Sequence, residues 1–549
     1  MPKHPAGSDK NEALTSDALT SDAPTNDAPP SDAPTGDAEP RQQQPATTPV
    51  VLQDWTPTGV CLDFQLGQLA FQRRGAQAFT THEVPNLVNQ GGLSAVRSAE
   101  VLFASCAEAE AQGALEVEIC GMEMAMGLGL HSVQLLDRFQ RRCVEAGKDW
   151  YDRLTWFATD ITPKMLHDAR ARGVFDRHTD RVVLAQADAR RPGAIRRLDD
   201  GAIVDVSGKL RMVVHTYLLC VLPANVFCRT ILDGVARWQV LVARTMLRHP
   251  EHLAAFGAPD LDTLRTRLAG ASISGADLVD LADLYPLLDL DLSLADFDLI
   301  EHPDRVELER IATLIAADRV APVEDKLWVL HSAGAQVSIG STLDALCPDG
   351  VLLYRDYGPG TVADADTPHI YQHYGPTTAI GINHIALDSW AEAADGGAAR
   401  VSLPEGEQGA AIKTRLIARA PITSVRAAFL HAYETSASEA LEAQINNARA
   451  AKTADAAIEL YRVALRMEPE NWALLGEVAE VALRSAQQLD LAEVLIREAL
   501  RINPWSSAAA WNTLGDVLWF RRDVDGAEAA FRRATEVNPE HARGWFNLY

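Results

Sequence analysis

Between about residues 55 and 430, short runs of apolar residues alternate with segments whose apolar residues recur at helical spacing. Short apolar runs are typical of buried strands, and a helical spacing is typical of a helix with one face on a core. The pattern predicts strands at 115–125, 154–160, 181–188, 210–219 and 350–358, and helices at 131–146 and 163–173. This alternation predicts an α/β fold, with a mostly parallel sheet and helices on both of its faces.

Two stretches of the same region depart from this alternation. Residues 225–325 are rich in Leu, Ala and Asp, as in DLVDLADLYPLLDLDLSLADFDL, and are too long for a plain crossover between strands. We therefore predict an inserted, mostly helical cap at 225–325. The stretch ARVSLPEGEQGAAIKTRLIARA, which begins at Ala399, predicts a terminal hairpin.

The segment 436–549 repeats itself. Pro469, Pro504 and Pro539 are spaced by 35 residues, and each follows two alanines that flank a bulky residue. The three sets are Ala457, Tyr461 and Ala464; Ala492, Ile496 and Ala499; and Ala527, Phe531 and Ala534. Small alanines let two helices approach closely, and a proline ends the second helix of each pair.

This repeat resembles the tetratricopeptide repeat, a helix-turn-helix unit of about 34 residues. The resemblance implies an all-α array with a concave groove that binds a protein or peptide partner. Trp545 and Leu548 have the spacing of the start of a further unit. Either a truncated chain or a capping helix would explain an end at Tyr549.

Residues 1–50 have a different composition from the rest. The pentad pattern places Asp17, Asp22, Asp27, Asp32 and Asp37 in register, among Ala, Pro, Ser and Thr. Such a segment has too few large apolar groups to offset the entropy of ordering it, so we predict a disordered tail. A solvated spacer is the preferred interpretation, and a docking tail is the alternative. The domains expected are thus 1–50, 51–435 and 436–549.

The charge and cysteine content narrow the classes of function. The 549 residues carry a formal net charge of −25, which argues against a basic groove for nucleic acid and against adhesion to an anionic membrane. The seven cysteines are scattered and form no Cys-x-x-Cys pair, so we expect reduced thiols, no zinc site and no other metal. No long apolar stretch and no signal-peptide pattern stand out, and we predict a cytoplasmic protein.

The candidate ligand-binding residues lie at the ends of the predicted strands. After the first strand the sequence reads Glu123-x-Ala125-x-Gly127-x-Gly129, a glycine turn that would let backbone N–H groups approach a ligand. The next two strands also end in acids, Asp160 and Asp188. Ligands of an open parallel sheet lie over the carboxyl ends of its strands, so these groups are predicted to share one site.

The glycine turn resembles the first motif of class I S-adenosylmethionine (SAM) methyltransferases, which have a Rossmann-like fold. The resemblance implies that Gly127 and Gly129 line the methionine part of SAM and that Glu123 organises the loop. It further implies that Asp160 holds the ribose hydroxyls and that Asp188 contacts the adenine amino group. Ile161 and Ala189, which follow these two acids, complete the predicted cofactor site.

Ala125 departs from this motif. It stands where the motif has its first glycine, and alanine is tolerable there only if its φ is negative.

The stretches VPNLVNQGGL, LLDRF, ATDITPKML, VVHTYLLCVLP and GVLLYRDYGPG resemble the MidA-like methyltransferases, which include protein-arginine methyltransferases. His215, Tyr217, Asp356 and Tyr357 are the candidates on the substrate side, although packed polar residues near a strand end would give the same pattern. Positions 216 and 220 are Thr and Cys where that family often has Asn and Asp.

Two families of hypotheses follow. The first is a SAM-dependent methyltransferase that acts on a protein acceptor recruited by the repeats. The second is a non-catalytic interaction scaffold with a degenerate methyltransferase fold, which the departures at Ala125, Thr216 and Cys220 favour. A nicotinamide-dependent oxidoreductase is a weaker third, because Ser132 stands where the third glycine of its fingerprint belongs.

Overall fold

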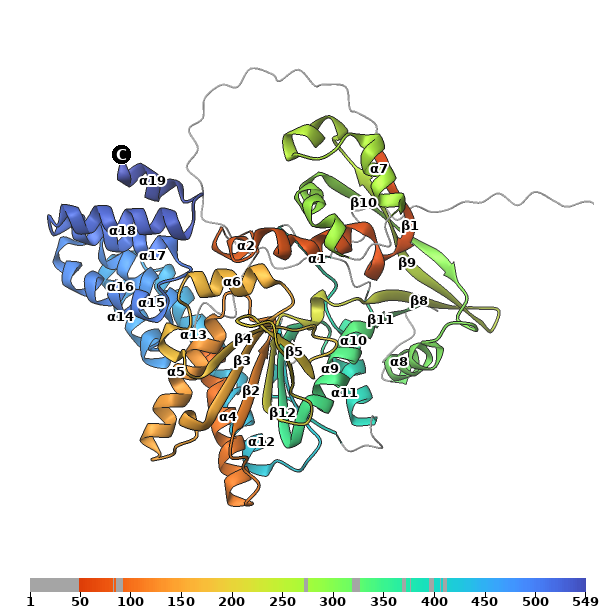
Figure 1. The fold of residues 1–549 in the computed structure, drawn as a ribbon, viewed down its shortest axis with the longest axis horizontal. Helices are drawn as coiled ribbons and strands as arrows, with labels where there is room; N and C mark the ends of the chain where they lie inside the picture. Colours follow the sequence, from red (N-terminus) through yellow and green to blue (C-terminus); the bar gives the residue numbers. More distant parts are fainter. Residues whose placement is uncertain are drawn as a thin grey trace, which may run out of the picture.

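The structure is a computed structural model of the 549-residue chain (Figure 1). The residues that it describes are 49–81, 83–84, 92–270, 275–317, 326–367, 372–375, 377–393, 399–404, 406–407 and 412–549. The predicted tail 1–50, apart from its last two positions, and most of VPNLVNQGGL lie outside the described residues. No helix in the described ranges is both long and apolar enough to cross a membrane.

The main sheet has nine strands in the order β15-β16-β12-β7-β2-β3-β4-β5-β6. Its central strands run parallel: β12 (Leu346–Tyr357), β7 (Leu210–Thr216), β2 (Ile119–Met124), β3 (Leu154–Asp160) and β4 (Val182–Gln186). The edge strands pair antiparallel: β15 (Arg400–Ser402), β16 (Ile412–Ala418), β5 (Ala194–Arg197) and β6 (Ile203–Asp205). The predicted α/β fold and the terminal hairpin are confirmed, and the strand order reverses between β2 and β7.

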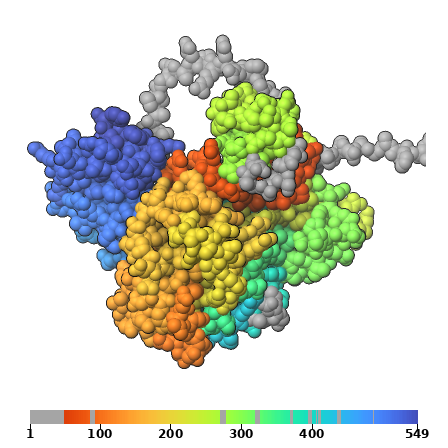
Figure 2. Space-filling model, viewed as in Figure 1, coloured from red at the N-terminus to blue at the C-terminus, as the bar shows by residue number. Residues whose placement is uncertain are grey.

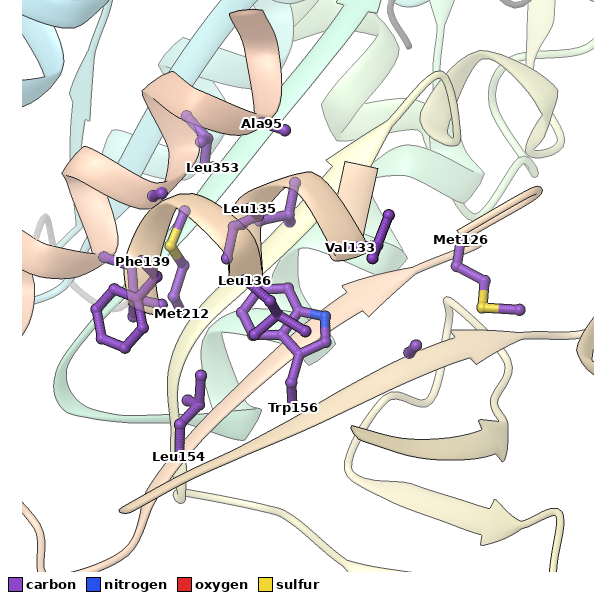
Figure 3. Close-up of a cluster of buried hydrophobic side chains, with 14 of the residues drawn as sticks. Ala95, Met126, Val133, Leu135, Leu136, Phe139, Leu154, Trp156, Met212 and Leu353 are labelled. Carbon is purple, nitrogen blue, oxygen red and sulfur yellow. The ribbon is translucent and has the colours of Figure 1, made fainter. Parts of the chain in front are cut away.

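Helices cover both faces of this sheet, each over its own core. On one face lie α4 (Leu93–Ala111), α5 (Leu130–Glu145), α6 (Pro163–Ala171) and α12 (Thr423–Ala432). On the other lie α9 (Ala333–Ala345) and α11 (His384–Ala393). Trp156 fills the first core beside Leu136 (Figure 3), and Gly121 on the next strand leaves room for its indole ring. These two cores fix the edge at which the parallel strands end.

The 225–325 segment is not the mostly helical cap that its composition predicts. It contributes β8 (Asn225–Leu232), β9 (Val235–Leu247) and β10 (Leu288–Phe297) to a second, antiparallel sheet that β1 (Val50–Pro57) and β11 (Lys326–His331) complete. In β10, Leu alternates with Asp or Ser at a period of two, which is a strand pattern. Helices are present as well: η6 (Pro250–Phe256), α7 (Leu261–Gly270), η7 (Gly275–Leu287) and α8 (Arg305–Ala317).

Two N-terminal helices lie between the two sheets (Figure 1). They are α1 (Leu62–Arg74) and the short α2 (Gln77–Thr80), and they cross above the carboxyl ends of the parallel strands. The backbone N–H of Ala76, between the two helices, donates to Asp168 Oδ2 of α6 at 2.9 Å. The small hairpin of β13 (Gln372–Tyr374) and β14 (Thr377–Ala379) packs against α1. The strand ends are thus covered by other parts of the chain.

The C-terminal region is an array of antiparallel helices. Its helices are α13 (Thr435–Arg449), α14 (Ala454–Met467), α15 (Trp472–Ala482), α16 (Leu489–Ile502), α17 (Ala508–Phe520), α18 (Val524–Val537) and α19 (Ala542–Leu548). The repeated alanines are buried where helices meet, and Phe531 lies against Gly515, which has no side chain to obstruct it. The all-α repeat domain is therefore confirmed as a fold.

The array is docked on the face of the main domain that α5 and α6 cover (Figures 1 and 2). Arg172, at the end of α6, donates to the carbonyl oxygen of Trp505 at 3.0 Å, and Trp505 belongs to the core on that face. Arg141 of α5 pairs with Glu470, which lies between α14 and α15. The connection between the two parts is thus buttressed by side chains as well as by the chain itself.

Candidate functional site

The loop between β2 and α5 adopts left-handed backbone at three alternate positions. Ala125 has a φ of 57°, Gly127 of 54° and Gly129 of 77°. The condition stated for an alanine at position 125, a negative φ, is therefore not met. Because a Cβ at positive φ approaches the neighbouring carbonyl, Ala125 costs about 1–2 kcal/mol that a glycine would avoid. The loop keeps its shape in spite of that strain.

The two glycines of the loop have different surroundings. Among the described residues, a Cβ added at Gly127 would meet only the ring of Phe79 from α2, at 3.6 Å, which is ordinary contact. A Cβ at Gly129 would stand 2.8 Å from the ring of Phe175, which is too close. Gly129 thus allows helix α5 to begin against Phe175, whereas Gly127 leaves the loop backbone open on one side.

Glu123 lies under this loop and is almost fully buried. The hydroxyl of Ser132 donates a short hydrogen bond to Glu123 Oε2, and the indole N–H of Trp156 donates to Ser132 Oγ at 2.7 Å. His131 Nδ1 lies 3.5 Å from Glu123 Oε1. Burial raises the pKa of Glu123 to about 8, and hydrogen bonds from Ser132 oppose that shift. Glu123 therefore links the end of β2 to the first turn of α5.

Asp160 ends β3 and faces the glycine loop. Its Oδ2 accepts from the backbone N–H of Gly127 at 3.4 Å, and its Oδ1 accepts from that of Thr162 at 2.9 Å. The residue is 6% exposed, and burial raises its pKa to about 6. Ile161 beside it is 49% exposed. The sequence prediction that the glycine turn and this acid converge is thus met by a direct contact.

Asp188 follows β4, next to Asp160. The backbone N–H of Ala187 donates to the carbonyl oxygen of Asp160 at 3.1 Å, which ties the two strand ends together. Arg190 pairs with the Asp188 carboxylate through its guanidinium and its backbone N–H. Burial alone would raise the pKa of Asp188, but these hydrogen bonds bring it below its usual value. Ala189 between them is buried.

His215 and Asp356, two of the candidates for the substrate side, are held inside the protein. His215 is buried under α9, with Nε2 at 3.4 Å from Thr342 Oγ1, and burial lowers its pKa to about 3. Asp356 accepts the backbone N–H groups of Leu219, Cys220 and Tyr357, and burial raises its pKa to about 6. Both side chains lie in the packed interior, and their place on the substrate side stays a prediction.

The other two candidates lie together with a third tyrosine. The ring centroids of Tyr217 and Tyr357 are 6.0 Å apart, and those of Tyr357 and Tyr374 are 5.9 Å apart. Tyr217 directly follows β7 and has a φ of 52°, a strained conformation for a residue with a side chain. All three rings are partly exposed or half-buried, near the switch point of the sheet.

Sequence reasoning missed several polar contacts around the site. Ser98 of α4 contacts His131 Nε2 at 3.1 Å and the hydroxyl of Tyr433 at 3.2 Å, so a buried polar chain runs from Glu123 to the residue after α12. Arg190, which neutralises Asp188, was also missed. The spacing of two residues between Asp188 and Arg190 was a signal for this pair.

One group of potential metal ligands occurs among the described residues: Glu116, Cys347 and Asp349. The guanidinium of Arg211 lies between the two carboxylates and donates to both, at 2.9 Å to each oxygen of Asp349. Arg211 is 1% exposed, so its fixed charge occupies the place that a cation would need.

Comparison with known proteins gives matches of two kinds. Residues 512–548 match the family model described as "Tetratricopeptide repeat". The first tetratricopeptide domain of the human RPAP3 protein is 18% identical over 21% of this chain and 85% of that chain, with a TM-score of 0.18. No curated protein sequence matches the chain.

Two solved structures from Burkholderia thailandensis match the larger part of the chain. An uncharacterized protein is 13% identical over 68% of this chain and 90% of that chain, with a TM-score of 0.38. A member of the same superfamily, solved with S-adenosyl-homocysteine bound, is 12% identical over 66% of this chain and 88% of that chain, with a TM-score of 0.39.

Proposed function

We propose that the chain is a SAM-dependent methyltransferase whose cofactor lies over the carboxyl ends of β2, β3 and β4. The observation that carries the proposal is the meeting of Gly127 and Asp160 at the ends of two neighbouring parallel strands, beside the point where the strand order reverses. Ligands of open α/β sheets bind at that place. The side of Gly127 at which a Cβ would meet only one ring of the described residues fits a bound nucleoside there.

In this proposal Asp160 accepts the two ribose hydroxyls. Each carboxylate oxygen offers two acceptor positions, so both oxygens of Asp160 can serve a ligand beside their backbone donors. Glu123 and Ser132 hold the loop in shape, and Asp188 with Arg190 borders the adenine end. SAM supplies an electrophilic methyl group, and the protein's part is to align donor and acceptor and to keep water out.

We further propose that the methyl acceptor is a protein that the repeats recruit. The array docks on the same domain as the predicted cofactor site, through Arg172 and Arg141. The contacts between α17 and α19 are polar: Asn547 donates to Asn512 Oδ1 at 3.0 Å, and Arg543 pairs with Asp516. All seven cysteines are free thiols, which fits a reducing, cytoplasmic setting.

Calorimetry with SAM and S-adenosyl-homocysteine tests the cofactor proposal. Replacing Asp160 with alanine removes the ribose acceptor, so we expect affinity to fall by at least tenfold. Asp200→Ala is the matched control, because Asp200 lies in the exposed turn between β5 and β6, paired with Arg197. Equal affinities of the Asp160→Ala variant and the wild type would exclude the ribose assignment.

The strain at Ala125 favours one alternative, a non-catalytic scaffold in which the repeats carry the function. A left-handed alanine in the cofactor loop is a departure that a binding loop under no selection for cofactor would tolerate. Wild-type protein that binds no SAM at millimolar concentration, yet captures a peptide partner through the array, would establish this alternative over the enzyme.

A further inference from the structure

Arg355 of β12 carries a charge for which the described residues supply no counterion. No hydrogen bond or ion pair of its guanidinium is found within the described part of the chain, and its Nε is buried without a hydrogen-bond partner. Its contact is with the ring of Tyr433, whose centroid lies 5.8 Å from the guanidinium carbon. The Arg355 side chain is half-buried, and a buried polar atom such as its Nε is costly without a partner, so the group is suited to bind an anion.

The register of the sheet places Arg355 at the level of the glycine loop. Arg355 pairs with Thr216 of β7, and His215 of β7 pairs with Met124, so Arg355 stands level with the residue after Met124. Side chains alternate along a strand, so Arg355 shares a face with Leu353, which Figure 3 places beside Ala95 of α4. This is the face on which Glu123 meets α5.

Contacts tie Arg355 to the loop on that same face. The hydroxyl of Tyr433 lies 3.2 Å from Ser98 Oγ, which lies 3.1 Å from His131 Nε2. His131 is the second residue of α5, and the charge of Arg355 adds to burial in lowering the pKa of His131 to about 3. Asp356, the acid next along the chain, points to the opposite face and is held by backbone N–H groups, so it does not neutralise Arg355.

A second guanidinium adds to the positive charge. Arg97 of α4 lies over the same ring, 5.4 Å from its centroid. Burial lowers the pKa of Arg97, and the charge of Arg355 lowers it further, so the two cations repel each other. Glu468 of the array lies near Arg97 and partly offsets that charge. An anion that meets Arg355 would remove the remaining imbalance.

We propose that Arg355 binds the α-carboxylate of the amino-acid end of the sulfonium nucleoside, with Arg97 adding to the attraction. The inference rests on the proposed function and deepens it. Asp160 and Arg355 stand on β3 and β12, three strand spacings apart, which is about 14 Å. A ligand with its ribose at Asp160 and its carboxylate toward the switch point lies between them, and the arginine side chain covers the rest of that distance.

The test compares two ligands that differ only in the carboxylate. Calorimetry is done with the full-length chain, S-adenosyl-homocysteine, and S-adenosyl-3-thiopropylamine, the same nucleoside thioether without its carboxylate. Arg355→Gln should lower the affinity for S-adenosyl-homocysteine by about tenfold to a hundredfold, since a hydrogen-bonded charge pair is lost. The decarboxylated ligand should bind the variant and the wild type equally. Arg355→Lys keeps the charge and should recover part of the affinity.

Each outcome separates this inference from the proposed function. If wild-type protein binds neither ligand, the cofactor proposal fails and the inference fails with it. If wild-type protein binds S-adenosyl-homocysteine but Arg355→Gln changes both ligands equally, or neither, the cofactor proposal stands and the assignment of Arg355 is overturned. Thermal unfolding of each variant shows whether an equal loss reflects a damaged fold.

Discussion

The glycine loop of the main domain and the helix pairs of the repeat array use the missing side chain of glycine in opposite ways. In the array, the ring of Phe531 fills the space at Gly515, so the glycine serves packing between two helices. In the loop, Gly127 has one ring at ordinary contact distance, so its missing side chain leaves room that the described residues do not fill. The filled space at Gly515 therefore serves packing, whereas the unfilled space at Gly127, at the ends of the parallel strands, fits the proposed cofactor site.

The largest expected effect on stability comes from adding a side chain at Gly515, and it is compared with the effect of adding one at Gly127. Gly515→Leu forces a side chain into the Phe531 ring and should cost about 3 kcal/mol of unfolding free energy. Gly127→Ala adds only a strained methyl group, about 1 kcal/mol, but should weaken SAM binding. Urea unfolding and calorimetry measure the two effects. Gly476→Ala is the helical control, because an added Cβ there meets nothing within 4 Å, and it should stabilise slightly.

The second expected effect is a pH dependence of the unfolding free energy, which arises from Glu123 under the glycine loop. Because burial raises the pKa of Glu123 from 4.5 to about 8, the folded state holds its proton where the unfolded state has lost it. This contribution to stability is complete below pH 4.5 and is lost as the pH rises to about 8, with a slope of at most about 1.4 kcal/mol per pH unit.

Glu123→Gln should flatten that slope. Urea unfolding at several pH values between 5 and 8 measures the difference between the variant and the wild type. A variant with the same slope as the wild type would show that Glu123 is ionised in the folded protein. The buried His131 and His215, whose lowered pKa values make stability rise with pH up to about 6.5, contribute equally to both proteins.

The smallest effect sharpens the interpretation of the strained loop. Ala125→Gly removes a Cβ from left-handed backbone, and the gain exceeds the entropy that glycine loses on folding, for a net stabilisation of about 0.5–1 kcal/mol. Thermal unfolding of the variant checks the sign. Destabilisation would mean that the methyl group of Ala125 packs well enough to outweigh its strain.

The sequence predicted the parts of the fold that rest on local periodicity. The strand at 154–160 was placed to the residue, because its apolar run is bounded on both sides by polar residues. The repeats were found because three prolines and their alanines recur in register, and each set is buried as expected. The alternation of strands and helices sufficed for the main sheet.

What sequence reasoning did not predict depends on features that local patterns do not contain. The Leu and Asp alternation of Leu288–Phe297 has the period of a strand, but the surrounding helical composition hid it. The sequence placed His215 and Asp356 near strand ends but did not show that they would be buried, because burial depends on how the strands pair and pack. Contacts such as Ser98 with His131 join residues far apart in the chain, so spacing cannot show them.

The short helix α6 connects the main domain to the repeat array through a side-chain contact. The nine-residue α6 begins three positions after Asp160 and ends beside Arg172, which grips the backbone of the array at Trp505. A helix of that length is stiff, so a displacement at one of its ends is transmitted to the other end. A tilt of the array that keeps this hydrogen bond would therefore displace α6, whose first residue lies three positions after Asp160.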